Sequence, residues 1–159
     1  MSIGLQITVD TSQAEQTLLR IGRSLDGSKF MLAVGLSLID WITANFESEG
    51  RKTGQAWAPL SPRTIMRRRK RGGGAKILQD IGRLKMSFTK APNPDVKING
   101  RGVSVTVGTE TQYAIYHESS EPRRRLPRRP MLPTEKQAQT LATTLLNAYV
   151  AKVLRQSGG

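Results

Sequence analysis

The chain has 159 residues, no cysteine and a formal net charge of +13 at pH 7. This length suits one domain with a buried core, and the lack of cysteine excludes disulfides, thiolate nucleophiles and cysteine-based zinc sites. The most apolar run, residues 30–46, is interrupted by Asp40 and Asn45, so the sequence predicts no membrane-spanning helix.

The positive charge is concentrated in two segments. Residues 51–90 carry twelve lysines and arginines and one acidic residue, Asp80, while residues 121–130 carry five arginines and one acidic residue, Glu121. The rest of the chain is close to neutral. Such basic segments usually face water, nucleic acid or an acidic protein surface.

The first part of the chain predicts one strand and two helices. Residues 3–9 alternate apolar and polar side chains, as a half-buried strand does. Ser12 and Glu15 form a capping box that opens an amphipathic helix over 12–26. Residues 29–46 are apolar on nearly every side and predict the central core helix.

The middle of the chain predicts a loop followed by a short helix. Residues 47–63 contain several glycines and prolines, which favour loop structure. Proline is favoured at the first position of a helix, so Ser61-Pro62 predicts a helix start. The glycines at 72–74 should end this helix.

The remaining elements are two helices and a hairpin. Residues 77–88 carry apolar side chains at helical spacing and predict a helix. Two short strands at 96–99 and 103–107 flank an Asn-Gly turn signal. A capping box at Thr134 and Gln137 opens a long amphipathic helix.

Together these elements predict a single α+β domain over residues 1–159. A small antiparallel β-sheet should pack against helices, and the long amphipathic helix should be C-terminal. Basic loops are predicted at about 61–76 and 119–130.

The sequence contains few residues that are arranged to support catalysis. His117 is the only histidine, and no nucleophile motif surrounds it although Glu118 and Ser119 follow. Glu47 and Glu49 form the only close acidic pair, without further metal ligands. The sequence therefore predicts no enzyme, no metal site and no cofactor. His117 is predicted to be structural, with its ring bonded to a backbone carbonyl where a helix ends.

The two basic segments are candidate contacts for DNA or for a partner protein. Lysine and arginine clusters neutralise phosphates and give salt-dependent binding. Aromatic residues make up 5% of the chain and none lies among these arginines, which argues against stacking on single-stranded bases. Non-specific backbone contact, contact with an acidic protein and a merely solvated segment stay open. The candidates are Arg67, Arg68, Arg69, Lys70, Arg71, Arg123, Arg124, Arg125 and Arg128.

Trp57 lies in a loop between glycines and prolines. A tryptophan in such a setting often anchors a long loop onto its domain. It also suits an interface hot spot, and the sequence does not decide between the two roles.

Several motifs occur in a fixed order along the chain. They are a phenylalanine ending a long helix, a Gly–x–x–Trp–x–x–Leu loop, a threonine before a basic run, Ile-Leu–x–x–x–Gly–x–Leu, Val-Gly-Thr, Tyr-Ala–x–x–His and an Arg-Pro step. Together they resemble the phage virion morphogenesis family, the tail completion proteins of Mu-like and other contractile-tailed phages. The resemblance covers about residues 30–135, and it departs after His117, where Glu118-Ser119-Ser120 replaces a polar residue, an aromatic and a glycine. The matching positions are Phe46, Gly54, Trp57, Leu60, Thr64, Ile77, Leu78, Gly82, Leu84, Val107, Gly108, Thr109, Tyr113, Ala114, His117, Arg129, Pro130, Met131 and Leu132.

The resemblance implies a tail terminator-like fold and a non-enzymatic structural role in the virion. Such a protein would form a ring, expected to be hexameric, that completes or terminates the tail and joins it to the head. Its implied partners are its own copies, the tail tube protein and a head-side neck or connector protein, with genomic DNA in the channel as a further candidate and no membrane. It would be assembled in the host cytoplasm and reside in the tail or neck. The alternative is a small non-specific nucleic-acid-binding protein.

Overall fold

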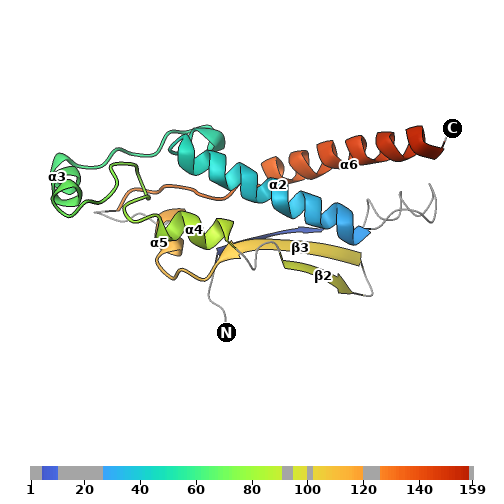
Figure 1. Cartoon of the computed structure of the whole chain (residues 1–159), viewed down its shortest axis with the longest axis horizontal. Helices are drawn as coiled ribbons and strands as arrows, with labels where there is room; N and C mark the ends of the chain where they lie inside the picture. The colour runs from blue at the N-terminus through green and yellow to red at the C-terminus, as the bar shows by residue number, and fades with distance from the viewer. Residues whose placement is uncertain (1–4, 11–26, 91–94, 100–101, 120–125, 158–159) are drawn as a thin grey trace.

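The structure is a computed structural model, and it describes residues 5–10, 27–90, 95–99, 102–119 and 126–157. Its elements follow one another from the N-terminal strand to the long C-terminal helix (Figure 1). They are β1 (Leu5–Asp10), α2 (Gly27–Glu47), η1 (Arg51–Thr53), α3 (Pro62–Lys70), α4 (Arg83–Thr89), β2 (Asp95–Asn99), β3 (Gly102–Thr109), α5 (Ala114–Glu118) and α6 (Glu135–Ser157).

The strands form a three-stranded sheet in the order β1-β3-β2, antiparallel on both sides of β3. Ile7 of β1 lies opposite Val107, and Val96 of β2 lies opposite Val105. Val105 and Val107 are fully buried, because side chains alternate along a strand and this face of β3 packs on α2. The predicted hairpin and antiparallel sheet are therefore present in a mixed α and β fold.

α2 is the central helix of the core. One row of its side chains is almost completely buried and faces the sheet and α6: Met31, Val34, Leu38, Ile42 and Phe46. Lys29–Glu47 is long enough, and with a mean hydropathy of 1.2 apolar enough, to cross a membrane. Among the described residues it is the one helix with these properties. Its buried row instead makes it the core helix that the sequence predicted.

α6 packs beside α2 and also contacts β1, so it completes the core next to the central helix. The predicted capping box is formed, since the Gln137 amide donates to Thr134 Oγ1 (3.3 Å) and the Thr134 amide donates to Gln137 Oε1 (3.0 Å). Ala138 and Ala142 are buried. Farther along the helix, Tyr149 packs on Phe30 of α2 with 5.7 Å between ring centroids.

One prediction needs correction. Residues 77–88 are not one helix, because α4 covers only Arg83–Thr89 and Leu78 has a left-handed backbone with φ 58°. The basic segment at 61–76 contains the nine-residue helix α3, which the Ser61-Pro62 start predicted. The helix predicted over 12–26 and part of the loop predicted at 119–130 lie outside the described residues.

Candidate functional site

The loop after α2 is anchored by Trp57. Its indole packs edge-on against Phe46, with 5.4 Å between ring centroids and 84° between the ring planes, and the side chain is 5% exposed. The Trp57 amide donates to the carbonyl of Glu49 (2.8 Å). Gly50 has a φ of 95°, and a Cβ at this position would overlap the indole. Trp57 therefore anchors the loop onto the carboxyl end of α2.

Residues 129–132, hereafter the strap, pass across this anchored loop. The carbonyl oxygen of Pro130 accepts from Trp57 Nε1 (2.9 Å) and from Asn45 Nδ2 (3.1 Å). The guanidinium of Arg129 is buried and donates from Nη2 and Nε to the carbonyl of Ala58 (2.9 and 3.2 Å). A buried arginine without partners would be costly, so these bonds fix the strap in one position.

The other side of the strap is bound to α5. The Arg129 amide donates to the carbonyl of His117 (2.8 Å), and the Met131 amide donates to Glu118 Oε2 (2.7 Å). Burial raises the pKa of the Glu118 carboxyl, although bonds from the strap's amides oppose the shift. Three segments distant in sequence thus meet in one junction: the end of α2 with its Trp57 loop, α5 and the strap.

His117 contributes to this junction through its backbone rather than its ring. The ring nitrogen Nδ1 is buried and has no hydrogen-bond partner among the described residues. Burial, and then the positive charge of Arg129, lower the pKa of the imidazole. Nδ1 therefore does not make the predicted bond to a backbone carbonyl. The described residues also hold no cluster of acidic or histidine side chains suited to a metal ion.

The segment between α3 and α4 is a turn tied to the end of α2. The Ile77 amide donates to Glu49 Oε1 (2.8 Å), and Gln79 Nε2 donates to the carbonyl of Phe46 (2.7 Å). This second bond satisfies a carbonyl that the end of a helix leaves without an intrahelical partner. The turn then places Phe88 of α4 against Phe46, with 6.2 Å between ring centroids.

The remaining positions of the family motif are distributed over several elements of the fold. Ile77, Leu84, Ala114 and Leu132 are buried, and Leu60 and Leu78 pack against the core. Gly54 and Gly82 have left-handed backbones, and Gly108 lies in β3. The Thr64 amide donates to the Ser61 side chain that caps α3 (3.2 Å), whereas Tyr113 is exposed.

The basic arm, here residues 61–76 with α3, differs from this junction because α3 has no buried residue. It is held through Arg68, which donates from Nη1 to the carbonyls of Lys76 (3.0 Å) and Gly74 (3.3 Å). Asp80 forms ion pairs with Arg71 and, at 3.7 Å, with Arg68. The side chain of Arg68 is 13% exposed, so it supports the arm from inside and is not free to meet a partner.

The outer face of α3 carries the cations that are available for contact. Three of the candidate contact residues, Arg67, Arg69 and Lys70, are exposed, and Arg63 is exposed as well. Sequence reasoning missed Arg63 because it stands outside the run at 67–71. Its spacing of four residues from Arg67 and seven from Lys70 is the signal that places it on the same helix face.

The described part of the second basic segment approaches the basic arm through Arg129. Burial, as the larger cause, and the nearby positive charge of Arg68 both lower the pKa of Arg129. The guanidinium of Arg129 also donates a hydrogen bond to the carbonyl of Ala58, a few residues before α3. Arg128 is exposed, and its Nε donates to the carbonyl of Glu118 (2.9 Å). Arg123, Arg124 and Arg125 lie outside the described residues.

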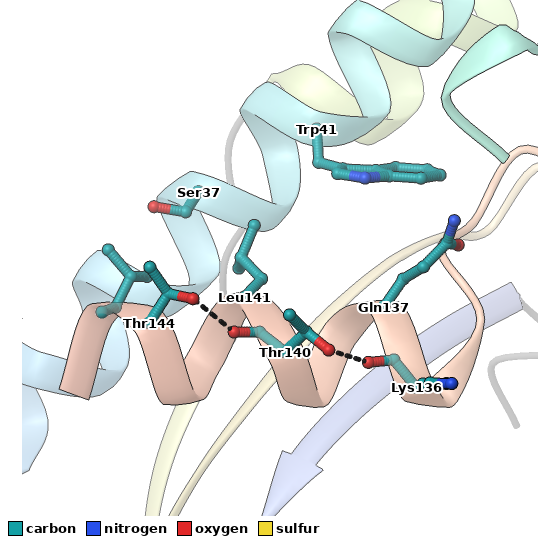
Figure 2. A pocket seen from close by; sticks show the side chains of 8 residues that line it. Ser37, Trp41, Lys136, Gln137, Thr140, Leu141 and Thr144 are labelled. Carbon is teal, nitrogen blue, oxygen red and sulfur yellow. Dashed lines mark hydrogen bonds between the residues drawn. The ribbon is translucent and has the colours of Figure 1, made fainter. Parts of the chain in front are cut away.

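A groove of about 480 Å³ lies between α2 and α6 (Figure 2). Trp41 and Leu141 line it with apolar surface. The hydroxyls of Thr140 and Thr144 donate to carbonyls of their own helix (both 2.8 Å). The sequence did not predict this groove, and its lining offers apolar contact rather than chemistry.

The junction and the arm define a small structural domain with a rigid framework and a charged projection. The chain matches the phage virion morphogenesis family over residues 9–151, and it belongs to that family. This confirms the resemblance carried by its motifs, and it makes the chain a virion-associated protein of phage morphogenesis. No curated protein and no solved structure gives a significant match to the chain.

Proposed function

We propose that the protein completes or terminates the phage tail and joins it to the head. It acts as a ring, expected to be hexameric, in the tail or neck of the virion, and it is assembled in the host cytoplasm without a cofactor or a membrane. Its partners are its own copies, the tail tube protein and a head-side connector protein. The observation that carries this proposal is the family match over residues 9–151, which spans the junction, the strap and the arm.

Exposed apolar side chains support assembly with neighbouring subunits. They are large and lie on and beside α4 and α5: Ile81, Met86, Tyr113, Ile115 and Tyr116. Apolar side chains gathered at a surface commonly mark interaction sites. A closed ring needs two different surfaces on each subunit, and this region is our candidate for one of them.

The arrangement around His117 supports a role without catalysis. A nucleophile or general base is normally oriented by a second polar group. Among the described residues, no hydrogen bond holds Nδ1 of the ring, and the backbone carbonyl of His117 is used to bind the strap. We therefore assign His117 to the framework.

The alternative function, a small non-specific nucleic-acid-binding protein, is favoured by one observation. The basic arm carries most of the net positive charge of the described residues, and Arg128 adds a further exposed cation. Binding to a phosphate backbone requires such a surface.

Electron microscopy of a lysate whose phage carries an early stop codon in this gene tests the proposal. Filled heads beside separate tails are the expected result, and abnormal tail lengths would indicate a role in termination. Supplying the intact chain from a plasmid should restore joined particles. Intact, infectious virions without the protein would overturn the proposal and favour the alternative.

A further inference from the structure

The exposed cations of α3 form one line on the outer side of the helix. Arg63, Arg67 and Lys70 are spaced i, i+4 and i+7, so they share a face. The inner side of the helix is occupied differently, since Arg68 donates to two backbone carbonyls and lies beside Asp80. The described outer line therefore has no acidic partner within the arm.

The arm also stands away from the bulk of the domain. α3 lies at one end of the molecule and the C-terminus of α6 at the other (Figure 1). α3 has no buried residue, and a helix of nine residues is marginal without support. The Ser61 cap, Arg68 and the Arg71–Asp80 pair supply that support from the inner side. The outer side is thus held in place while remaining accessible.

From these features we infer that the outer face of α3, together with Arg128, binds the phosphate backbone of double-stranded DNA without reading its sequence. This inference rests on the proposed function, because a ring at the neck would place the arm close to the packaged genome. The surface consists of Arg63, Arg67, Arg69, Lys70 and Arg128.

The spacing of the charges fits a duplex backbone. Seven residues of helix rise by about 10 Å at about 1.5 Å per residue. At about 3.4 Å of axial advance per phosphate, that length covers about three steps, and so about four phosphates, of one strand. Arg63, Arg67 and Lys70 can therefore each reach a different phosphate through their long side chains.

The composition of the surface favours DNA over an acidic protein. Protein interfaces usually contain a buried apolar or aromatic centre, whereas DNA-binding surfaces are more polar and much more positive. α3 offers one large exposed apolar side chain, Met66, and it contains no aromatic residue. The lack of aromatics also favours duplex over single-stranded bases.

The salt dependence of binding by the full chain to a labelled duplex of mixed sequence tests this inference. The matched variants are Arg63→Gln/Arg67→Gln/Lys70→Gln in the arm and Lys136→Gln/Lys152→Gln/Arg155→Gln on exposed positions of α6. Both remove three positive charges from a helix, and circular dichroism should show both folded. Because each phosphate contact contributes about 0.9 to the log–log slope, the arm variant should lose about 2.7 from it. The α6 variant should keep the slope of the unmodified chain.

Three outcomes decide the inference. A slope lowered only by the arm variant supports it, and Arg63→Lys/Arg67→Lys should then keep the slope because a phosphate needs only the charge. Equal loss in the arm and α6 variants would show a general effect of net charge and overturn it. No duplex binding at about 50 mM salt would also overturn it and leave an acidic protein as the partner. The proposed function fails separately, through intact virions from the stop-codon phage.

Discussion

The junction around Trp57 and the basic arm are neighbours in sequence, yet they are stabilised in different ways. In the junction, a buried indole and a buried guanidinium bind the backbone of distant segments. In the arm, nothing on α3 is buried, and short-range bonds from Arg68 and Arg71 hold the helix. Since core contacts dominate stability, substitutions in the junction should change folding, whereas substitutions on the outer arm should change function alone.

The largest expected effect is that of Trp57→Ala. The change removes a buried aromatic side chain and the hydrogen-bond donor to the Pro130 carbonyl. The free energy of unfolding should therefore fall by about 3–5 kcal/mol. Urea unfolding of the purified protein measures this. Trp57→Phe keeps a ring against Phe46 and loses mainly the hydrogen bond, so it should cost about 1 kcal/mol. Equal, small losses for both variants would show that the indole does not anchor the loop.

A pair of glycines should give the next largest effect. Gly50 and Gly54 have nearly the same left-handed φ, 95° and 94°, but only a Cβ at Gly50 would overlap Trp57. The backbone strain alone should cost about 1–2 kcal/mol in Gly54→Ala. Gly50→Ala should lose about 1–3 kcal/mol more because the indole must move. Thermal unfolding of the two variants compares them, and equal melting temperatures would contradict the contact.

A smaller effect should separate two neighbouring arginines of the arm. Arg68→Gln removes the donor to the Lys76 and Gly74 carbonyls, so it should cost about 1–2 kcal/mol. Arg67→Gln changes an exposed side chain and should stay within about 0.5 kcal/mol of the unmodified protein. Urea unfolding again provides the measurement. The run at 67–69 is therefore not one exposed set, and a loss in Arg67→Gln equal to that in Arg68→Gln would contradict this division.

The smallest effect should come from His117. Burial lowers the pKa of its ring below the ordinary value of 6.5, so the folded state favours the neutral imidazole. The resulting stability is present above pH 6.5 and is lost as the pH falls from 6.5 through the lowered pKa. The raised pKa of Glu118 has the opposite pH dependence. Its contribution to the stability of the folded state is present at low pH and is lost as the pH rises through the raised pKa.

Because His117 is the only histidine, its ring resonances report its pKa without ambiguity. Proton NMR should place that pKa below 6.5. In His117→Gln the loss of stability just below pH 6.5 should be absent. Comparing this variant with the unmodified protein therefore separates the contribution of the imidazole from that of Glu118. A pKa above 6.5 would contradict the buried, neutral ring.

Local patterns predicted the regular elements well. The apolar residues of 29–46, the capping box at Thr134 and the alternating valines of β3 each depend on contacts close in sequence. Each corresponds to an element of the structure: α2, α6 and β3. The Ser61-Pro62 start likewise predicted α3 and its cap.

The failed helix over 77–88 shows where such patterns mislead. Ile77 and Ile81 have helical spacing, yet they lie in a turn and not in a helix. Ile77 is buried in the core, whereas Ile81 is 74% exposed. The turn is fixed by Glu49 and by the Phe46 carbonyl, which are about thirty residues away in sequence. Long-range bonds of this kind override local propensity.

The junction itself could be predicted only as a set of motif positions. The Pro130 carbonyl accepts hydrogen bonds from both Trp57 and Asn45. These bonds form only because the chain after α5 brings the strap back to the end of α2. Nor did the sequence separate Arg68, which supports the arm, from Arg67 beside it. The direction of a side chain on a short exposed helix depends on the loop that packs against it.

The most direct test of the account is the fraction of joined particles when the arm variant Arg63→Gln/Arg67→Gln/Lys70→Gln is supplied to the stop-codon phage. Electron microscopy counts joined and separate heads and tails, with the α6 variant as the control. If the framework folds independently and the outer arm acts in the virion, the arm variant should be soluble and folded yet leave heads and tails separate. Normal numbers of joined particles from the folded arm variant would contradict the functional role of the arm.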